Sequence, residues 1–252
     1  MKNWIRSVGC EIEGGILEAG DYDSLYREGG RLVRDFTIGG DVSVWVSECE
    51  YESVELKFWF YYPKEYENAK KFIKFVFERL KQNHTCGNHI HLKFKGDVWT
   101  LISFPKFFRK FKEEYVKFSE SKGKRKDIYL SRLKERWCRY RYSELTVVNQ
   151  LRRSYRLADR YTMINLNSFP KYKTIEFRIL PFVLGAEEYL ENLEWLINTV
   201  NKLISSLLER SVLITKKSWV RIHSEEYILV DDIELIDKDK FLDNDYTITI
   251  YK

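Results

Sequence analysis

The sequence is poor in the residues that mark disulfide-rich, proline-rich or membrane-spanning proteins. Its 252 residues include only four prolines and four cysteines, which are Cys10, Cys49, Cys86 and Cys138. The cysteines show no paired spacing, and a chain of this length can bury a core without disulfides, so we expect reduced thiols. No apolar run approaches the roughly 20 residues of a membrane helix. The first residues carry charges where a secretory signal has its apolar stretch. We therefore expect a cytoplasmic protein that does not bind a membrane.

The net charge of +5 is unevenly distributed along the chain. The segment from Lys122 to Arg160 contains thirteen Lys or Arg against four Asp or Glu, so the remainder of the chain sums to −4. This segment is either an electrostatic site for phosphates or another anionic partner, or a solvated helical face. A non-catalytic protein that binds nucleic acid by phosphate contacts and aromatic stacking fits the first alternative. We favour such a nucleic-acid-binding protein less than an enzyme.

Helical and strand-like patterns alternate along the chain. Apolar residues recur at helical spacing from Ala69 to Leu80, from Phe108 to Phe118 and from Leu190 to Leu207, and we expect a basic helix at about 127–142. Period-two strand patterns occur at 7–15, 41–48, 53–60, 88–94, 161–169 and 173–180, with shorter ones at 212–217, 219–223, 227–235 and 246–251. The glycine pairs in "EGGRLVR" and "TIGGD" are expected to mark turns.

This order predicts an α+β fold with a largely antiparallel sheet whose one face is covered by helices. Because the chain shows no repeat and no Pro-rich linker, we expect a single domain over residues 1–252. Residues 211–252 are expected to form a small C-terminal appendage or a hairpin that completes the sheet.

Five of the predicted strands or their flanks carry a polar pair at positions i and i+2, and such pairs point to one side of a strand. The pairs are Glu11 with Glu13, Asp41 with Ser43, Glu55 with Lys57, His89 with His91, and Glu176 with Arg178. For any single pair, a solvent-facing sheet surface explains the pattern. Taken together, the carboxylates would repel one another if the strands are neighbours, and a divalent cation would relieve that repulsion.

Carboxylates combined with imidazoles suit Mg²⁺ or Mn²⁺, and Zn²⁺ is a further alternative. Cys86, His89 and His91 have the spacing of a C-x-x-H-x-H zinc set, but no second Cys or His cluster accompanies them. We therefore favour Mg²⁺ or Mn²⁺ held by carboxylates and histidines.

Five short motifs occur in an order that resembles the amidoligase family, whose fold is similar to that of glutamine synthetase. They are "VGCEIEGG", "DVSVWVSECEYESVELK", "CGNHIHLKF", "RYTMINLNSF" and "KTIEFRIL", and they run from Val8 to Leu180. The resemblance implies a curved antiparallel sheet with helices packed on its outer face. Its concave face would hold ATP, divalent metals and a carboxylate substrate.

The resemblance also implies a role for each matching residue. The metal ligands would be Glu11, Glu13, Glu55, His89, His91 and Glu176. The catalytic residues would be Arg178, Arg160, Asp41 and Ser43, and the residues that contact ATP would be Arg178, Arg160, Asn165 and Lys57. Lys57 stands where the family more often has a small residue, and its ammonium group either contacts phosphate or displaces a metal.

The implied function is an ATP-dependent carboxylate-amine ligase that forms an amide through an acyl phosphate. The amine or acid partner could be a small molecule, a peptide or a protein terminus. The sequence has no GxxxxGK[ST] motif, which excludes a P-loop, but phosphates can also be held by metals and arginines. The same residues would also serve another metal-dependent phosphotransferase or an ATP hydrolase.

Overall fold

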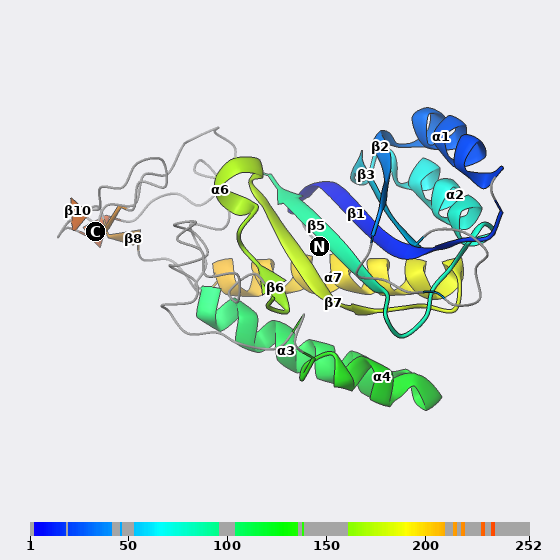
Figure 1. Cartoon of the computed structure of the whole chain (residues 1–252). Helices are drawn as coiled ribbons and strands as arrows, with labels where there is room; N and C mark the ends of the chain where they lie inside the picture. Colours follow the sequence, from blue (N-terminus) through cyan, green and yellow to red (C-terminus); the bar gives the residue numbers. More distant parts are fainter. Residues whose placement is uncertain are drawn as a thin grey trace.

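The chain forms an α+β fold around an open antiparallel sheet (Figure 1). The structure, a computed structural model, describes residues 3–18, 20–41, 46, 53–95, 104–135, 138 and 161–209, with short strand segments at 214–215, 218–219, 228–229 and 233–234. Every strand pairing in these residues is antiparallel. The predicted fold class, α+β with a largely antiparallel sheet, is confirmed at this level.

The main sheet has the strand order β2-β3-β1-β5-β7-β6, with β4 paired to the end of β1. Its strands are β1 (Ile5–Ile16), β2 (Arg34–Gly40), β3 (Ser53–Tyr61), β4 (Leu80–Lys81), β5 (Gly87–Phe94), β6 (Ile164–Asn165) and β7 (Thr174–Pro181). The predictions of strands at 7–15, 53–60, 88–94 and 173–180 are confirmed, with small shifts of their ends. The order places the strands that carry the polar pairs next to one another.

The helices are α1 (Asp21–Leu32), α2 (Tyr66–Phe77), α3 (Phe104–Ser121), α4 (Lys126–Ser131), α6 (Phe169–Tyr172) and α7 (Ala186–Glu209), with a 3-10 turn at Gly123–Arg125. All of them except the short α6, which lies at the N-terminal end of β7, pack against one face of this sheet. In Figure 1, α7 runs behind β1, β5 and β7, and α1 and α2 lie beside β2 and β3. The long helices predicted around 108–118 and 190–207 are confirmed as α3 and α7.

Alternation along the strands explains this arrangement. Apolar residues at every second position are buried, and their rings meet those of the helices: Phe58 lies 5.1 Å from Phe72 of α2, and Phe177 lies 5.1 Å from Phe111 of α3. Burying these side chains is the main source of stability. The intervening positions face the other side of the sheet, and they hold the polar pairs.

Two predicted elements end earlier than expected. The stripe that starts at Ala69 belongs to α2, but Leu80 lies beyond it in β4, opposite Ile16 of β1. Leu80 fills the space over Gly14, where a Cβ atom would lie only 2.4 Å from Leu80 Cδ2. The basic helix expected at 127–142 is only α4, because the backbone turns at 132–135, and most of the rest lies outside the described residues.

The strand expected at 161–169 is much shorter than predicted. Only Ile164 and Asn165 pair with β7. The Asn165 side chain accepts a hydrogen bond from the Asn167 N–H at 3.0 Å, which favours a turn, and Pro170 follows in the first turn of α6. This early turn keeps residues 165–168 at the end of the sheet.

The expectation of a turn in "EGGRLVR" is wrong, because Gly29 and Gly30 lie within α1. Gly39 and Gly40 end β2. The strand at 41–48 is not confirmed, since only Asp41 and Val46 of it are described and neither is in a strand. In the region 211–252, β8 (Ile214–Thr215) pairs with β11 (Ile233–Glu234), and β9 (Ser218–Trp219) pairs with β10 (Ile228–Leu229). The strand expected at 246–251 lies outside the described residues.

Among the described residues, no helix combines the length and the apolar character that crossing a membrane requires.

Candidate metal and substrate site

The strand register gathers the polar pairs of β1, β3, β5 and β7 on one face of the sheet, and we call this group of side chains the row. Glu11 of β1 stands between Lys57 of β3 and His89 of β5. Two residues further along β1, Glu13 faces Glu55 of β3. Two residues from His89 in the other direction, His91 of β5 faces Glu176 of β7. Residues about 5 Å apart across antiparallel strands interact directly. The row therefore places carboxylates and imidazoles in mutual contact.

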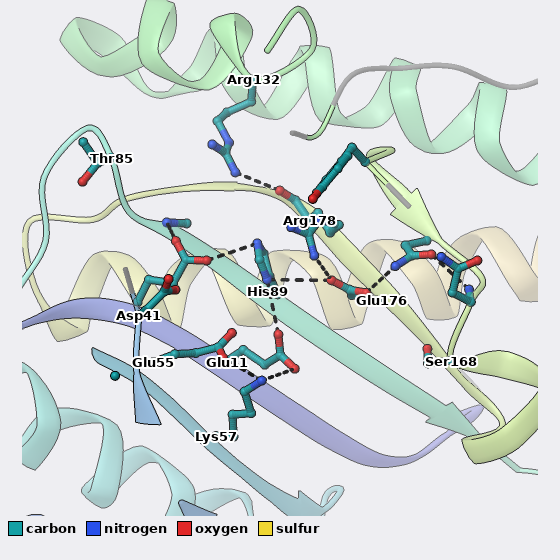
Figure 2. A pocket seen from close by; sticks show the side chains of 16 residues that line it. Glu11, Asp41, Glu55, Lys57, Thr85, His89, Arg132, Ser168, Glu176 and Arg178 are labelled. Carbon is teal, nitrogen blue, oxygen red and sulfur yellow. Dashed lines mark hydrogen bonds and ion pairs between the residues drawn. The ribbon is translucent and has the colours of Figure 1, made fainter. Parts of the chain in front are cut away.

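A hollow of about 770 Å³ lies over this row, and we call it the acidic hollow (Figure 2). Its lining is Glu11, Glu13, Gly40, Asp41, Glu55, Lys57, Thr85, Gly87, His89, Arg132, Tyr161, Asn165, Asn167, Ser168, Glu176 and Arg178. Acidic groups dominate its floor, and arginines reach it from two sides. This distribution of charge suits an anionic ligand that binds together with metal cations.

His89 is the centre of the row. Its Nδ1 atom lies 3.3 Å from Glu11 Oε2 and 3.7 Å from Glu176 Oε1, and its Nε2 atom lies 3.8 Å from Glu13 Oε1. Figure 2 shows the imidazole between the Glu11 and Glu176 carboxylates. The side chain is only 7% exposed. One imidazole thus contacts three carboxylates from two strands.

His91 extends the row towards the other end of β5. Its Nε2 atom lies 3.2 Å from Glu11 Oε1, yet this buried nitrogen makes no well-aligned hydrogen bond within the described residues. Burial alone would lower the pKa of His91, but Glu11 and Glu176 raise it because they stabilise the imidazolium.

Burial and neighbouring charges also act against each other on the pKa values of the carboxylates. Burial favours their neutral forms, but contacts with His89 and His91 hold the pKa of Glu11 far below its ordinary value. Against burial, the charges of His91 and Arg178 lower the pKa of Glu176. Burial raises the pKa of Glu55, and the nearby Glu11 charge adds to this effect. The charges of the histidines and of Arg178 therefore favour the ionised forms of Glu11 and Glu176, whereas the contact with Lys57 does not offset the burial of Glu55.

A β-bulge lies beside His89. The register between β5 and β7 shifts between Asn88 and Ile90, so that Arg178 and Ile179 together oppose His89. Bulges of this kind re-aim side chains next to functional sites. Arg178 is only 12% exposed and forms an ion pair with Glu176.

Glu176 is also fixed from its other side. Asn165 of β6 donates a hydrogen bond from Nδ2 to Glu176 Oε2 at 2.6 Å. Both oxygens of this buried carboxylate are therefore oriented by neighbours on its own sheet. Such support from outer groups is what holds a metal ligand in place.

Glu13 and Asp41 complete the opposite end of the hollow. The Gly87 backbone N–H donates to Glu13 Oε2 at 2.6 Å. The Asp41 N–H donates to the Ser53 carbonyl oxygen at 2.9 Å, which holds Asp41 at the end of β2. Gly39 stands opposite Glu55, so no side chain of β2 lies directly beside that carboxylate.

Three groups of side chains have ligand atoms that all lie within 4.8 Å of one another. They are Glu11 with Glu55 and His89, Glu11 with His91 and Glu176, and Glu13 with Asp41 and Glu55. Glu11 and Glu55 each belong to two of them, and Glu11 belongs to both groups that contain a histidine. In the two groups that contain Glu11, carboxylate oxygens with one imidazole nitrogen match the preference of Mg²⁺ and Mn²⁺, and a cation between these carboxylates would relieve their repulsion. The donor set therefore fits a divalent metal.

Lys57 already supplies one cation to this cluster. Its Nζ atom lies 2.6 Å from Glu55 Oε2 and 3.7 Å from Glu11 Oε1. Its side chain is 48% exposed, so the ammonium group can turn into solvent when another cation binds between the carboxylates.

A second hollow of about 440 Å³ continues along the same face of the sheet, and we call it the aromatic hollow. Its lining is Arg6, Ser7, Gly9, Cys10, Glu11, Asp35, Lys57, Phe58, Trp59, Tyr61, His91, Lys93, Ser168, Tyr172 and Thr174. It shares Glu11, Lys57 and Ser168 with the acidic hollow. Gly9 keeps its floor open, since a Cβ atom there would lie 3.2 Å from His91 Cβ.

The structure brings together ten of the twelve residues predicted for the site. Nine line the acidic hollow: Glu11, Glu13, Asp41, Glu55, Lys57, His89, Asn165, Glu176 and Arg178. His91 lines the aromatic hollow. Ser43 and Arg160 lie outside the described residues. Cys86 joins none of the potential metal groups found among the described residues, because it packs with Val46 and Phe182 in a small separate cluster.

Sequence reasoning missed several residues of the hollow. Arg132 and Thr85 come from segments between the predicted strands, and Tyr161, Asn167 and Ser168 surround the short β6. Gly87 lies within the third motif, but the sequence alone indicates no role for it. The i, i+2 rule cannot find such residues, because they reach the site from turns and helix ends.

The described part of the basic segment is partly neutralised within the protein. Lys122 lies 2.9 Å from Glu191, Arg125 lies 2.9 Å from Glu188, and Arg132 pairs with Glu135. Residues 139–160 lie outside the described part of the chain.

The chain matches no family model, no curated protein and no solved structure. The resemblance to the amidoligases therefore stays a prediction from the sequence motifs.

Proposed function

We propose that the protein is an ATP- and divalent-metal-dependent carboxylate-amine ligase of the amidoligase type, with a glutamine synthetase-like sheet, that forms an amide through an acyl phosphate. The observation that carries this proposal is the position of Glu11, which belongs to two adjacent ligand groups on one sheet face. Adjacent cations at such a position are typical of phosphoryl transfer.

In this proposal, Glu11, Glu55 and His89 hold one Mg²⁺ or Mn²⁺, and Glu11, His91 and Glu176 hold another. When bound, these ions would neutralise the charge of the phosphates and of the carboxylate that is phosphorylated. Glu13 and Asp41 lie beside the first group and provide a third set of oxygens with Glu55.

The two hollows are assigned to different substrates. The aromatic hollow suits ATP, because Trp59 and Tyr61 offer ring surfaces and Arg6 and Lys93 offer positive charge. The acidic hollow suits the acid and the amine, since its carboxylates attract an ammonium group once metals have balanced part of their charge. Because both hollows contain Glu11, the reacting groups would meet over this residue.

The protein's own groups have defined tasks in this reaction. Arg178 adds fixed positive charge next to Glu176, where negative charge develops during phosphoryl transfer. Asn165 keeps Glu176 oriented. A nucleophilic side chain is not needed, because the carboxylate of the substrate attacks the phosphoryl group and the amine then displaces phosphate.

The reaction is tested by ADP release. The full chain is incubated with ATP, Mg²⁺ and pools of candidate acids and amines, and ADP and amide products are measured by mass spectrometry. ADP release that requires both an acid and an amine supports the ligase. ADP release that is independent of the amine supports a phosphotransferase or an ATP hydrolase, and contradicts the proposal.

A binding test separates the site from the reaction. We expect Mn²⁺ with ATP to raise the melting temperature of the parent protein, because ligands stabilise the state that binds them. The variants His89→Ala and Glu176→Ala should fold but lose this rise. Equal rises in parent and variants contradict the proposed site.

A further inference from the structure

Lys57 stands between the two hollows. Glu55, Lys57 and Trp59 occupy alternate positions of β3, so their side chains point to the same face of the sheet. Glu55 lines the acidic hollow, Trp59 lines the aromatic hollow, and Lys57 lines both. Lys57 is therefore placed between the proposed metal site and the proposed ATP site.

The ammonium group of Lys57 contacts two of the three ligands of one proposed ion, which we call the first ion. That ion would be held by Glu11, Glu55 and His89. Lys57 Nζ lies 2.6 Å from Glu55 Oε2 and 3.7 Å from Glu11 Oε1, and Figure 2 draws both contacts. An ammonium group and a divalent ion that contact the same carboxylates repel each other. Lys57 therefore competes with the first ion.

The other proposed ion, which we call the second ion, shares fewer ligands with Lys57. It would be held by Glu11, His91 and Glu176. In the described part of the chain, the ion pairs of Lys57 are those with Glu55 and Glu11, and the one with Glu55 is the shorter. Glu55 is a ligand of the first ion and not of the second. The competition therefore acts mainly on the first ion.

The Lys57 side chain has room to leave the carboxylates. It is 48% exposed, and one side of it faces the open aromatic hollow. Neighbouring side chains on one face of a strand are about 7 Å apart, and the flexible stem of a lysine spans such a distance. The ammonium group can therefore turn from Glu55 towards Trp59 while the backbone of β3 stays in place.

We propose that Lys57 is a tethered cation that weakens binding of the first ion until a nucleotide phosphate in the aromatic hollow draws its ammonium group away. This inference rests on the proposed function, in which ATP occupies the aromatic hollow and divalent ions bind around Glu11. The nucleotide then binds before the first ion. Because such coupling is reciprocal, nucleotide and first ion tighten each other's binding.

Mn²⁺ binding to the nucleotide-free full chain tests the competition. Electron paramagnetic resonance measures the number of bound ions and their affinities. Glu55→Gln removes a ligand of the first ion only, so the ion that this variant loses is the first ion. In the parent protein, the first ion is expected to bind at least ten-fold more weakly than the second. Equal affinities for the two ions overturn the inference.

Two replacements of Lys57 separate the charge from the shape of the side chain. Lys57→Met should bind the first ion at least ten-fold more tightly than the parent, because the competing charge is gone. Lys57→Arg keeps the charge and should bind the first ion as weakly as the parent. An unchanged affinity in Lys57→Met, or an equal gain in Lys57→Arg, overturns the inference.

The control for these variants is Lys70→Met. Lys70 lies on α2 with its Nζ atom 2.6 Å from Glu67, the same distance as in the pair of Lys57 with Glu55, but it lines neither hollow. The affinity for the first ion should equal that of the parent. If Lys70→Met tightens Mn²⁺ binding as much as Lys57→Met does, the effect is one of overall charge and the inference is wrong.

The nucleotide step is tested with the tetraammine cobalt(III) complex of ATP. The metal of this complex does not exchange, so its β- and γ-phosphates do not take up Mn²⁺. A saturating amount of the complex should tighten binding of the first ion at least ten-fold in the parent protein, and less than two-fold in Lys57→Met. No tightening in the parent, or equal tightening in both proteins, overturns the inference.

The same titrations separate this inference from the proposed function. If neither the parent nor Lys57→Met binds Mn²⁺, the proposed function and this inference are both contradicted. If the parent binds both ions and Lys57→Met binds them with the same affinities, only this inference is contradicted.

Discussion

At the scale of single residues, Glu11 is the most informative position, because its carboxylate belongs to both ligand groups that contain a histidine. Replacement of Glu11 by Gln keeps the size of the side chain but removes its charge. We predict that Glu11→Gln weakens both Mn²⁺ sites at least ten-fold, whereas His91→Gln weakens only the site shared with Glu176. Mn²⁺ stoichiometry and affinity can be measured by electron paramagnetic resonance.

The control for this prediction is Glu114→Gln. Glu114 lies on α3 and pairs with Lys117, outside both hollows. Binding should be unchanged in this variant. If Glu11→Gln binds as many ions as Glu114→Gln, the shared-carboxylate site is wrong.

Many residues of the site could be predicted from the sequence, because side chains alternate between the two faces of a strand. Residues i and i+2 share a face, so the pair of His89 and His91 could be placed without knowing the strand order. Arg132 could not be predicted this way. Its approach depends on where the chain turns after α4 and on the space that Gly87 leaves, and neither follows from a local pattern.

At the scale of elements, α1 shows how packing overrides propensity. Gly29 and Gly30 both disfavour a helix, and so the sequence predicts a turn. In the structure, Gly29 lies against Phe36 of β2, and a Cβ atom there would be 2.4 Å from the ring. Glycine is thus required for the contact between helix and strand.

The two glycines give a matched pair of variants. We predict that Gly29→Ala lowers the free energy of unfolding by about 1 to 3 kcal/mol, because the methyl group collides with Phe36. Gly30→Ala should raise it by about 0.5 kcal/mol, since Gly30 is exposed and a methyl group there would have no atom within 4 Å. Urea denaturation measures both, and destabilisation of equal size would contradict the assigned contact.

Glu65 connects β2, β3 and the start of α2. It forms an ion pair with Arg34 and accepts a hydrogen bond from the Tyr61 N–H at 2.9 Å. Its contact with Arg34 lowers the pKa of Glu65 to about 2 from an ordinary value of 4.5. The folded state therefore favours the ionised carboxylate.

This lowered pKa predicts the direction of a pH effect. The stabilisation by Glu65 is fully present above about pH 4.5 and is lost as the pH falls towards 2, because protonation then removes the ion pair. Since Arg34 is half exposed, we expect Glu65→Gln to cost only about 1 kcal/mol at pH 7. The difference between parent and variant in urea denaturation should shrink at pH 2 to 3, and a constant difference would contradict this role of Glu65.

At the scale of the whole molecule, the strand order is what makes a site from separate motifs. The sequence predicts most strands, since β1, β3, β5 and β7 each have a clear period of two. The sequence does not predict that β1 lies between β3 and β5, or that a bulge in β7 lies beside His89. Those features depend on contacts between distant segments, which local patterns do not encode.

The two ligand groups that share Glu11 are proposed to bind divalent cations, and the whole function depends on them. The most direct measurement is anomalous diffraction from crystals of the full chain soaked in Mn²⁺. We predict anomalous peaks between the Glu11 carboxylate and the imidazoles of His89 and His91. Crystals that bind Mn²⁺ elsewhere and show no peak at Glu11 would contradict this prediction.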